Sequence, residues 1–401
     1  MATAEEPNAH STHSDAGGPE PGTRANTPRR ANWLELFFDL VMVAFVGQLA
    51  LGVHGDPHPA QFLTFAVLFF PAWWAWVNVM LTLNLFGERV TGRIWLMVSV
   101  AMFAVGMMAA ASIDGLGERA WAYALGNAIL RLVLFIAWWS QGRRNGVPWY
   151  RPVLYCGVTA VLWTVSAFVP PPGRYVLWAV AIGIEVLLLA FLGRESSWLR
   201  QALNIEHVTE RVGLFVVIVF GESVLAVFAE WSASWSIASG LTAILAFAAI
   251  ALLAWSFFTY STDIAERGWR RLHASGNLGA LRDTVMYLPF FLVSSIVLLA
   301  AGLGTAVADP TEPLSPGASV AVAGGIAVFY GTNALILLRY RERLRAVLRW
   351  AVVGVMLPLA LLLFAPFVTA AGLVAGALIV IGVMVLQAEW HRRSALVPLA
   401  Q

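Results

Sequence analysis

Carboxylic acids lie inside long apolar segments of this sequence, where a charged group needs a partner or a purpose. Glu35 and Asp39 are four residues apart, so a helix would place both on one face. Two carboxylates at that spacing repel each other unless a proton, a cation or an arginine lies between them. The pair could therefore carry protons or bind cations, although Glu35, one turn nearer to the segment's end, could also cap the helix.

A third acid, Glu222, lies deeper in another apolar segment, directly after Gly221 and 11 residues beyond Arg211. An isolated charge near the bilayer midplane costs several kcal/mol, so we expect Glu222 to be protonated or to bind a cation. It is then a candidate proton carrier or cation ligand, with Gln48 and Ser223 as further candidates on the same pathway. The alternative is a neutral acid that hydrogen-bonds a neighbouring helix, a contact of about 1 kcal/mol.

One arginine and one glutamate also fall within apolar segments. Arg131 and Glu185 lie at similar distances from the ends of their segments, so they share one depth in a membrane. An ion pair is the simplest explanation. Removing one partner of such a pair costs on the order of 3–5 kcal/mol, because the other charge stays behind. We predict a structural role for this pair.

Three tryptophans follow one another closely in a single apolar segment, deeper than an aromatic belt at a membrane surface. They are Trp73, Trp74 and Trp76, with the polar Asn78 two residues further on. Together with Tyr287 from a distant segment, they form a candidate pocket for a ligand or a lipid. Packing between helices is the alternative, and it is the commoner role of such clusters.

Metal and cofactor sites are not predicted. The single cysteine, Cys156, can form neither an intrachain disulfide nor a cysteine metal site. His54 and His58 flank Asp56 and could bind zinc, but in a loop we expect them to be solvated. The sequence contains no Walker motif, no His-Glu-x-x-His motif and no dinucleotide fingerprint, so we predict no cofactor. The net charge of +2 is too small to indicate a nucleic-acid partner.

The segments that position these residues are long enough to cross a membrane. Hydrophobic residues make up 59% of the 401 residues and charged residues 12%, whereas soluble proteins carry roughly 25% charged residues. An apolar helix of about 20 residues crosses a ~30 Å hydrocarbon core. We therefore predict an all-α polytopic membrane protein in a lipid bilayer, with about twelve transmembrane helices over residues 33–53, 60–84, 93–113, 119–140, 152–170, 174–193, 211–230, 236–260, 284–307, 317–338, 350–367 and 370–390.

The arginines predict the orientation of these spans. All 25 basic residues are arginines, and nearly all fall on one side of the predicted membrane. Arg119 and Arg174 lie in loops on the other side, and Arg131 lies within a span. Because positively charged loops stay in the cytoplasm, both termini are predicted to be cytoplasmic.

The two halves of the chain resemble each other in short stretches. Residues 45–48 match residues 219–222 in the first span of each half. We predict two parallel six-helix repeats, an arrangement common among transporters, whose sites lie near the repeat interface. The predicted organisation is a disordered cytoplasmic tail, a first repeat, an interfacial linker and a second repeat, over residues 1–31, 32–193, 194–210 and 211–393.

Several stretches of the sequence are similar to the bacterial low temperature requirement A (LtrA) family. They are residues 32–41, with a Glu-Leu-Phe-Phe-Asp core, residues 73–76, and residues 210–215 running into a Gly-Glu-Ser stretch. The resemblance covers nearly the whole chain after the tail. It implies a protein of the bacterial cytoplasmic (inner) membrane, and it implies that Glu35, Asp39 and Glu222 occupy signature positions of the family.

The chain departs from this family at one place. Where members often carry His-Leu-Pro, this chain has Tyr287, Leu288 and Pro289. If that histidine takes part in proton transfer in the family, this chain transfers protons differently or not at all. The family's name records growth at low temperature and brings no named activity with it.

Three functions fit these residues. We favour a secondary transporter or channel for a small ion or solute, with Asp39 and Glu222 at or near the pathway. The second is a membrane-embedded enzyme that modifies lipid, against which stands the absence of a histidine from every predicted span. The third is a non-catalytic membrane scaffold or sensor that docks partners on its arginine-rich cytoplasmic loops. The oligomeric state is not predicted.

Overall fold

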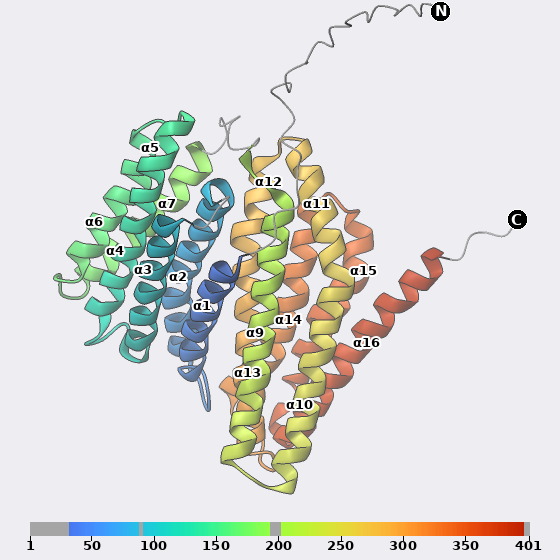
Figure 1. Ribbon diagram of the computed structural model, residues 1–401. Helices are drawn as coiled ribbons and strands as arrows, with labels where there is room; N and C mark the ends of the chain where they lie inside the picture. Colours follow the sequence, from blue (N-terminus) through green and yellow to red (C-terminus); the bar gives the residue numbers. More distant parts are fainter. Residues whose placement is uncertain (1–31, 88–90, 193–201, 397–401) are drawn as a thin grey trace, which may run out of the picture.

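The computed structural model describes residues 32–87, 91–192 and 202–396, and within these ranges the chain is helical, without a strand. The helices form two groups that stand side by side (Figure 1). The first group contains α1 (Trp33–Leu51), α2 (Pro59–Phe86), α3 (Gly92–Ala111), α4 (Ala120–Ala137), α5 (Tyr150–Pro152), α6 (Val158–Ser166) and α7 (Gly173–Leu192). The second group contains α9 (Ile205–Ala233), α10 (Ile237–Ser256), α11 (Thr262–Ala274), α12 (Leu278–Arg282), α13 (Leu288–Ala308), α14 (Pro316–Arg339), α15 (Leu344–Leu361) and α16 (Ala370–Leu396).

Eleven helical segments in the described part of the chain are long and apolar enough to cross a membrane. This confirms the prediction of an all-α polytopic membrane protein. The predicted span over residues 152–170 corresponds to a shorter helix, in which α5, the π-helical turn η4 (Val153–Gly157) and α6 follow one another without a break.

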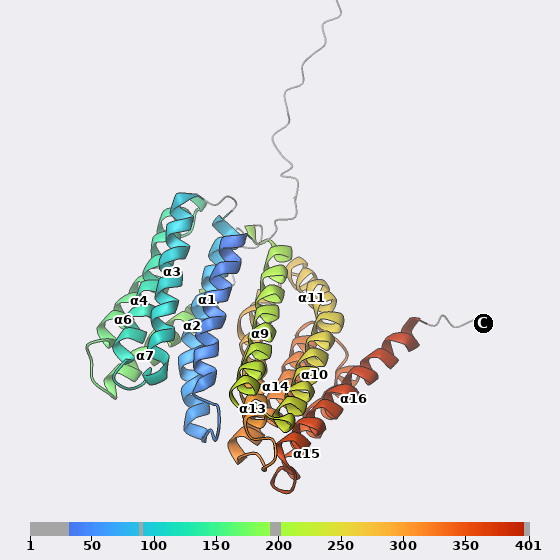
Figure 2. The same cartoon turned by 60° about the horizontal axis from the view of Figure 1, so that its bottom comes forward.

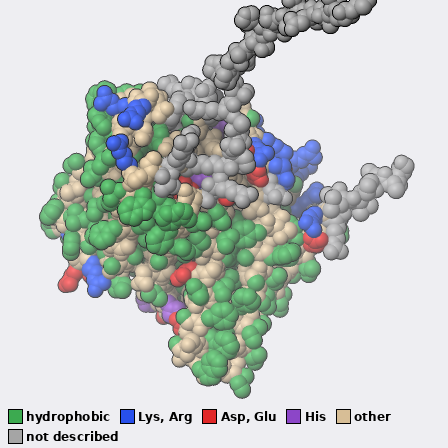
Figure 3. Space-filling view, viewed as in Figure 1, with side chains coloured by type: hydrophobic (Ala, Val, Ile, Leu, Met, Phe, Trp, Pro, Cys, Tyr) green, Lys and Arg blue, Asp and Glu red, His purple; other side chains and the backbone are tan. Residues whose placement is uncertain are grey.

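The outer surface fits a lipid environment. Large hydrophobic side chains such as Phe103, Phe168 and Ile379 are 69%, 80% and 67% exposed. Figure 3 shows a broad hydrophobic surface, with most of the visible arginines near its upper end. A hydrophobic surface of this extent is stable in contact with lipid and not with water.

Helix α9 begins six residues earlier than the span predicted from residue 211. The side chain of Asn204 caps it by accepting a hydrogen bond from the backbone N–H of His207 at 3.0 Å. Residues 205–210 are therefore the first residues of α9, which extends into the predicted linker over residues 194–210. The rest of that linker up to residue 201, and the predicted tail over residues 1–31, lie outside the described residues.

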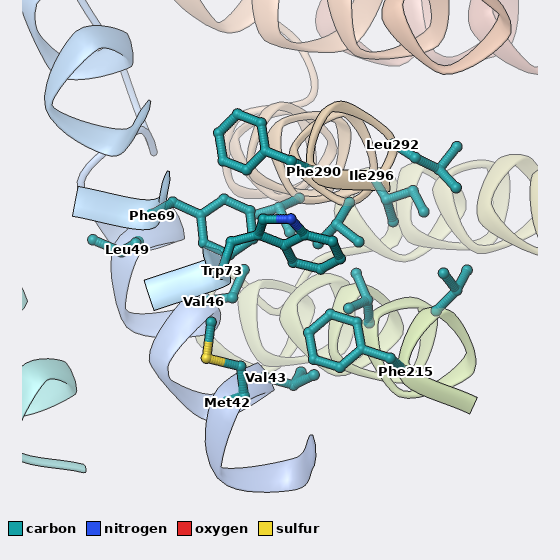
Figure 4. Packing of buried hydrophobic residues seen from close by; sticks show 14 of the residues in the cluster. Met42, Val43, Val46, Leu49, Phe69, Trp73, Phe215, Phe290, Leu292 and Ile296 are labelled. Atoms are coloured by element: carbon teal, nitrogen blue, oxygen red, sulfur yellow. The ribbon is translucent and has the colours of Figure 1, made fainter. Parts of the chain in front are cut away.

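The two groups meet where α1 and α2 pack against α9 and α13. Figure 4 shows Trp73 of α2 at this interface, with Phe69 beside it, Phe215 on α9 and Phe290 on α13. The ring centroid of Trp73 lies 6.1 Å from that of Phe69 and 5.8 Å from that of Phe215. Aromatic pairs at these separations stabilise by about 0.5–1.5 kcal/mol beyond the burial of their surface.

The same order of helix contacts occurs in both groups. In the first group, α1 packs on α3, α3 on α4, α4 on α6 and α6 on α7. In the second, α9 packs on α13, α13 on α14, α14 on α15 and α15 on α16. Helices α15 and α16 lie at the outer edge of the second group, away from the first (Figures 1 and 2).

Candidate functional site

A buried cluster of ionisable side chains joins the two groups of helices. Glu35 and Asp39 are one turn apart on α1, and they face His207 and Arg211, which are one turn apart on α9. Arg211 Nη2 lies 2.5 Å from Asp39 Oδ1, and Arg211 Nη1 lies 2.9 Å from Glu35 Oε2. His207 Nε2 lies 2.8 Å from the same oxygen of Glu35. All four residues are at most 3% exposed.

The protonation of His207 follows from its neighbour Asn84 on α2. The Asn84 Oδ1 accepts the backbone N–H of Asn204 at 3.0 Å, while its Nδ2 donates to the Asn204 carbonyl at 2.9 Å. This pair of bonds fixes which end of the amide is the NH₂ group. The same Nδ2 lies 3.0 Å from His207 Nδ1, which must therefore accept. His207 is thus neutral, with its proton on Nε2, and it donates that proton to Glu35.

Asp39 has one satisfied oxygen and one unsatisfied oxygen. Its Oδ1 accepts hydrogen bonds from Arg211 and from the indole Nε1 of Trp76, the latter at 2.7 Å. Its Oδ2 is buried and has no hydrogen-bond partner within the described residues. Because Arg211 also contacts Glu35, Asp39 shares its cation with a second carboxyl group. Within the described residues, the Oδ2 atom is therefore an acceptor whose position is not used.

Half of this cluster was predicted from the sequence. Glu35 and Asp39 were candidate residues, and an arginine was among the groups expected between them, but Arg211, at the start of its predicted span, was not paired with the two acids. The statement that no histidine lies within a span was wrong, because His207 lies in the span Ile205–Ala233. Asn84 was not considered. The signal that could have found the α9 residues is their spacing of four, which matches that of Glu35 and Asp39.

Glu222 lies elsewhere on the same helix pair. It stands just past the middle of the 29-residue α9, is partly exposed, and has no hydrogen bond or ion pair within the described residues. Its carboxyl group lies against Gly47 of α1, where an added Cβ would come 2.7 Å from Glu222 Oε1. Gln48 is exposed on α1, and the buried Ser223 donates to the carbonyl of Val219 at 2.9 Å. The structure thus does not bring Glu222 into contact with Asp39.

Arg131 and Glu185 are in contact within the first group. Arg131 donates twice to Glu185, from Nε at 2.9 Å and from Nη2 at 3.1 Å. Its Nη1 donates to Asn127 at 2.8 Å, and Nη2 also reaches the carbonyl of Pro71, the proline inside α2. The guanidinium carbon lies 5.5 Å from the ring centroid of Trp163. The charges of Arg131 and Glu185 balance each other. Through these contacts Arg131 holds α4 against α2 and α7.

The tryptophans of α2 are packed side chains, and two of them stack on each other. Trp73 stacks on Trp76 at 4.9 Å between ring centroids and donates to the carbonyl of Met286 at 2.7 Å. Trp74 stacks on Tyr287 at 5.4 Å. All three indoles are fully buried. Asn78 donates to the carbonyl of Trp74 at 2.7 Å and accepts from the hydroxyl of Tyr155 at 3.0 Å.

Metal-ligating side chains do not gather in the part of the chain that the structure describes. No group of three or more His, Cys, Asp and Glu residues there could hold a metal ion. His54 Nε2 lies 3.6 Å from Glu230, and Cys156 is buried and free.

The family model of the bacterial low temperature requirement A protein matches residues 30–387. An uncharacterized protein of Rhizobium meliloti (strain 1021) is 27% identical over 210 residues. That similarity covers 49% of this chain and 50% of the relative, so the chain spans about half the length of that curated relative. Because the family model covers nearly the whole sequence, the chain belongs to the bacterial low temperature requirement A (LtrA) family.

Proposed function

We propose that this protein is a secondary transporter or channel for a small ion or solute in the bacterial cytoplasmic membrane, with both termini on the cytoplasmic side. The observation that carries the proposal is the buried contact between Asp39 of α1 and Arg211 of α9. Ionisable groups inside membrane spans mark ion and proton pathways in many transporters. The Oδ2 of Asp39, which has no hydrogen-bond partner among the described residues, gives this pathway a position for one proton or one small cation.

The position of the contact supports transport. The shared order of helix contacts in the two groups is the arrangement expected of two parallel repeats, over residues 32–193 and 211–393. Transporters built from such repeats move one half against the other around a site at their interface. The Asp39–Arg211 contact crosses that interface, because α1 belongs to the first half and α9 to the second.

Protonation of Asp39 would change the contact between the halves. The ionised carboxylate attracts the guanidinium of Arg211, and a charge-assisted hydrogen bond stabilises by about 1.5–3 kcal/mol. Protonation of Asp39 removes the attraction between opposite charges and leaves only a hydrogen bond from the guanidinium to a neutral acid, so it loosens α1 from α9. Arg211 can then remain paired with Glu35, which His207 holds in place through its own hydrogen bond. Proton binding is thereby coupled to movement of the halves.

Glu222 extends the pathway away from this cluster. Its contact residue Gly47 lies eight residues beyond Asp39 on α1, which is about 12 Å along a helix. Both acids therefore lie along one seam between α1 and α9. In this arrangement Glu222 receives the ion that Asp39 releases, or passes it on to Asp39.

Reconstitution into liposomes tests the proposal. Potassium, sodium and proton fluxes are measured for the wild type and for Asp39→Asn, which keeps the shape of the side chain and removes its charge. Glu118→Gln, an exposed acid before α4, is the matched control. We expect flux of at least one of these ions in the wild type and the control, and little in Asp39→Asn. Equal flux in all three proteins would contradict the role of Asp39.

A membrane-embedded, lipid-modifying enzyme is the second candidate, because His207 and Glu35 form a buried acid–base pair inside a span. A strain that lacks the protein would then show an altered lipid composition, which His207→Gln would fail to restore. Restoration of the lipids by that variant would exclude this alternative.

A further inference from the structure

The second half contains a cavity that the proposed pathway does not use. Its volume is about 280 Å³, and it lies between π-helical turn η6 (Phe257–Ser261) with α11 on one side and α14, α15 and α16 on the other. A second hollow of about 340 Å³ shares Ile264, Leu337 and Trp350 with the first and continues from it. Small-molecule sites commonly have volumes of about 300–1,000 Å³, so the two together can hold a ligand.

The inner walls of the cavity are apolar or uncharged. Phe329, Ile336 and Met384 contribute hydrophobic surface. Tyr330 and Tyr340 also line the cavity. Neither hydroxyl group forms a hydrogen bond of ordinary geometry within the described residues. Burial raises the pKa of the Tyr340 phenol, so this part of the wall carries no charge at neutral pH.

Arginines line both hollows. Arg349 lines the first, and Arg267 and Arg271 line the second, together with one acid, Glu342. Arg271 lies 3.8 Å from Glu342, which balances its charge. Arg267 and Arg349 have no acidic partner within the described residues. An apolar interior below two cations that have no acidic partner among the described residues matches a molecule with an anionic head and a hydrocarbon tail.

The edge of the bundle gives such a molecule access from the membrane. Helices α15 and α16 form that edge (Figure 2). Their side chains Leu344, Leu348 and Trp390 are 56%, 45% and 68% exposed, and they face lipid in a membrane. The arginines that line the two hollows lie at the end of the bundle where the arginines of the chain gather, which is the end at which a lipid headgroup would stand.

We propose that this cavity binds one anionic phospholipid, with its phosphate between Arg267 and Arg349 and an acyl chain among Phe329, Ile336 and Met384. Basic pockets between transmembrane helices bind anionic headgroups by the same charge attraction. The site is independent of the Asp39–Arg211 contact, so it does not depend on the proposed transport activity.

Native mass spectrometry tests this proposal. The protein is released from nanodiscs that contain equal amounts of phosphatidylglycerol and phosphatidylethanolamine, and the retained lipid is identified. Each arginine near a membrane surface contributes about fivefold in affinity for an anionic lipid. We therefore expect preferential retention of one phosphatidylglycerol by the wild type, and a roughly 25-fold loss in the double variant Arg267→Gln with Arg349→Gln.

Two further variants separate the site from general surface charge. The double variant Arg143→Gln with Arg144→Gln removes two exposed arginines from the first half and should retain the lipid. Ala346→Phe, at a residue that lines both hollows, should displace the lipid without changing the charge. Equal loss in both arginine double variants, or full retention in Ala346→Phe, would overturn the proposal. Displacement of the lipid by free glycerol phosphate at equal concentration would also overturn it, because the ligand would then be a soluble anion.

Discussion

Replacement of Arg211 by methionine would leave Asp39 and Glu35 buried without the cation that they share. Methionine matches the aliphatic stem of arginine, so the variant keeps the contacts of the stem and removes the guanidinium. Removing one partner of a buried ion pair costs about 3–5 kcal/mol, because the remaining charge cannot return to water. Glu35 keeps the hydrogen bond from His207, whereas Asp39 keeps only that from Trp76. The cost therefore falls mainly on Asp39.

Neutralising Asp39 as well should recover part of this loss. Asp39→Asn alone removes the charge of one of the two carboxylates that share Arg211 but keeps an acceptor oxygen, so it should cost less than removal of the cation. The double variant Asp39→Asn with Arg211→Met should be less destabilised than the sum of the two single variants, by about 0.5–3 kcal/mol, because the residues are in contact.

Equilibrium unfolding in detergent micelles measures these free energies. The fluorescence of the 18 tryptophans reports unfolding, and Trp76 donates directly to Asp39. Arg144→Met, at an exposed arginine, is the control and should stay within about 0.5 kcal/mol of the wild type. If Arg211→Met were as stable as this control, or if the two single losses simply added, the argument for a coupled buried pair would be wrong.

Three further substitutions, at Glu222, Gly47 and Arg131, test the pathway and the structural ion pair. Glu222→Gln should lower ion flux in liposomes while changing the free energy of unfolding by less than about 0.5 kcal/mol, since Glu222 has no partner among the described residues; a loss of stability instead would show a structural role. Gly47→Leu should also lower flux, because the leucine side chain would occupy the space of the Glu222 carboxyl group. Unchanged flux would contradict a pathway that runs between α1 and α9. Arg131→Met should destabilise by about 3–5 kcal/mol yet leave the flux per folded molecule unchanged, and reduced flux would contradict its structural assignment.

The fold could be predicted from the sequence because lipid imposes a simple pattern. An apolar segment in a membrane must be helical, so segment length and hydrophobicity are sufficient to find the spans. The same reasoning failed at the start of α9, where polar residues such as Glu206, His207 and Glu210 interrupt the apolar pattern. Their helix is capped by Asn204, and part of it is buried between α1 and α2 rather than exposed to lipid.

The candidate site could be predicted only in part for a related reason. A hydropathy pattern shows which residues are costly in lipid, but not which costly residues face one another. Glu35 and Asp39 stood out because their segment is otherwise apolar, whereas Arg211 lay at the edge of a polar stretch and looked like a loop residue. Asn84, which sets the protonation of His207, is an ordinary polar residue near the end of α2, and only the contact gives it a role.

Proton and cation flux through reconstituted protein tests the central claim most directly. The comparison is between wild type and Asp39→Asn, normalised to the amount of folded protein in the liposomes. The proposed pathway predicts flux in the wild type and its loss in Asp39→Asn. Flux that is unchanged by Asp39→Asn would show that the buried contact between α1 and α9 holds the two halves together and carries no ion.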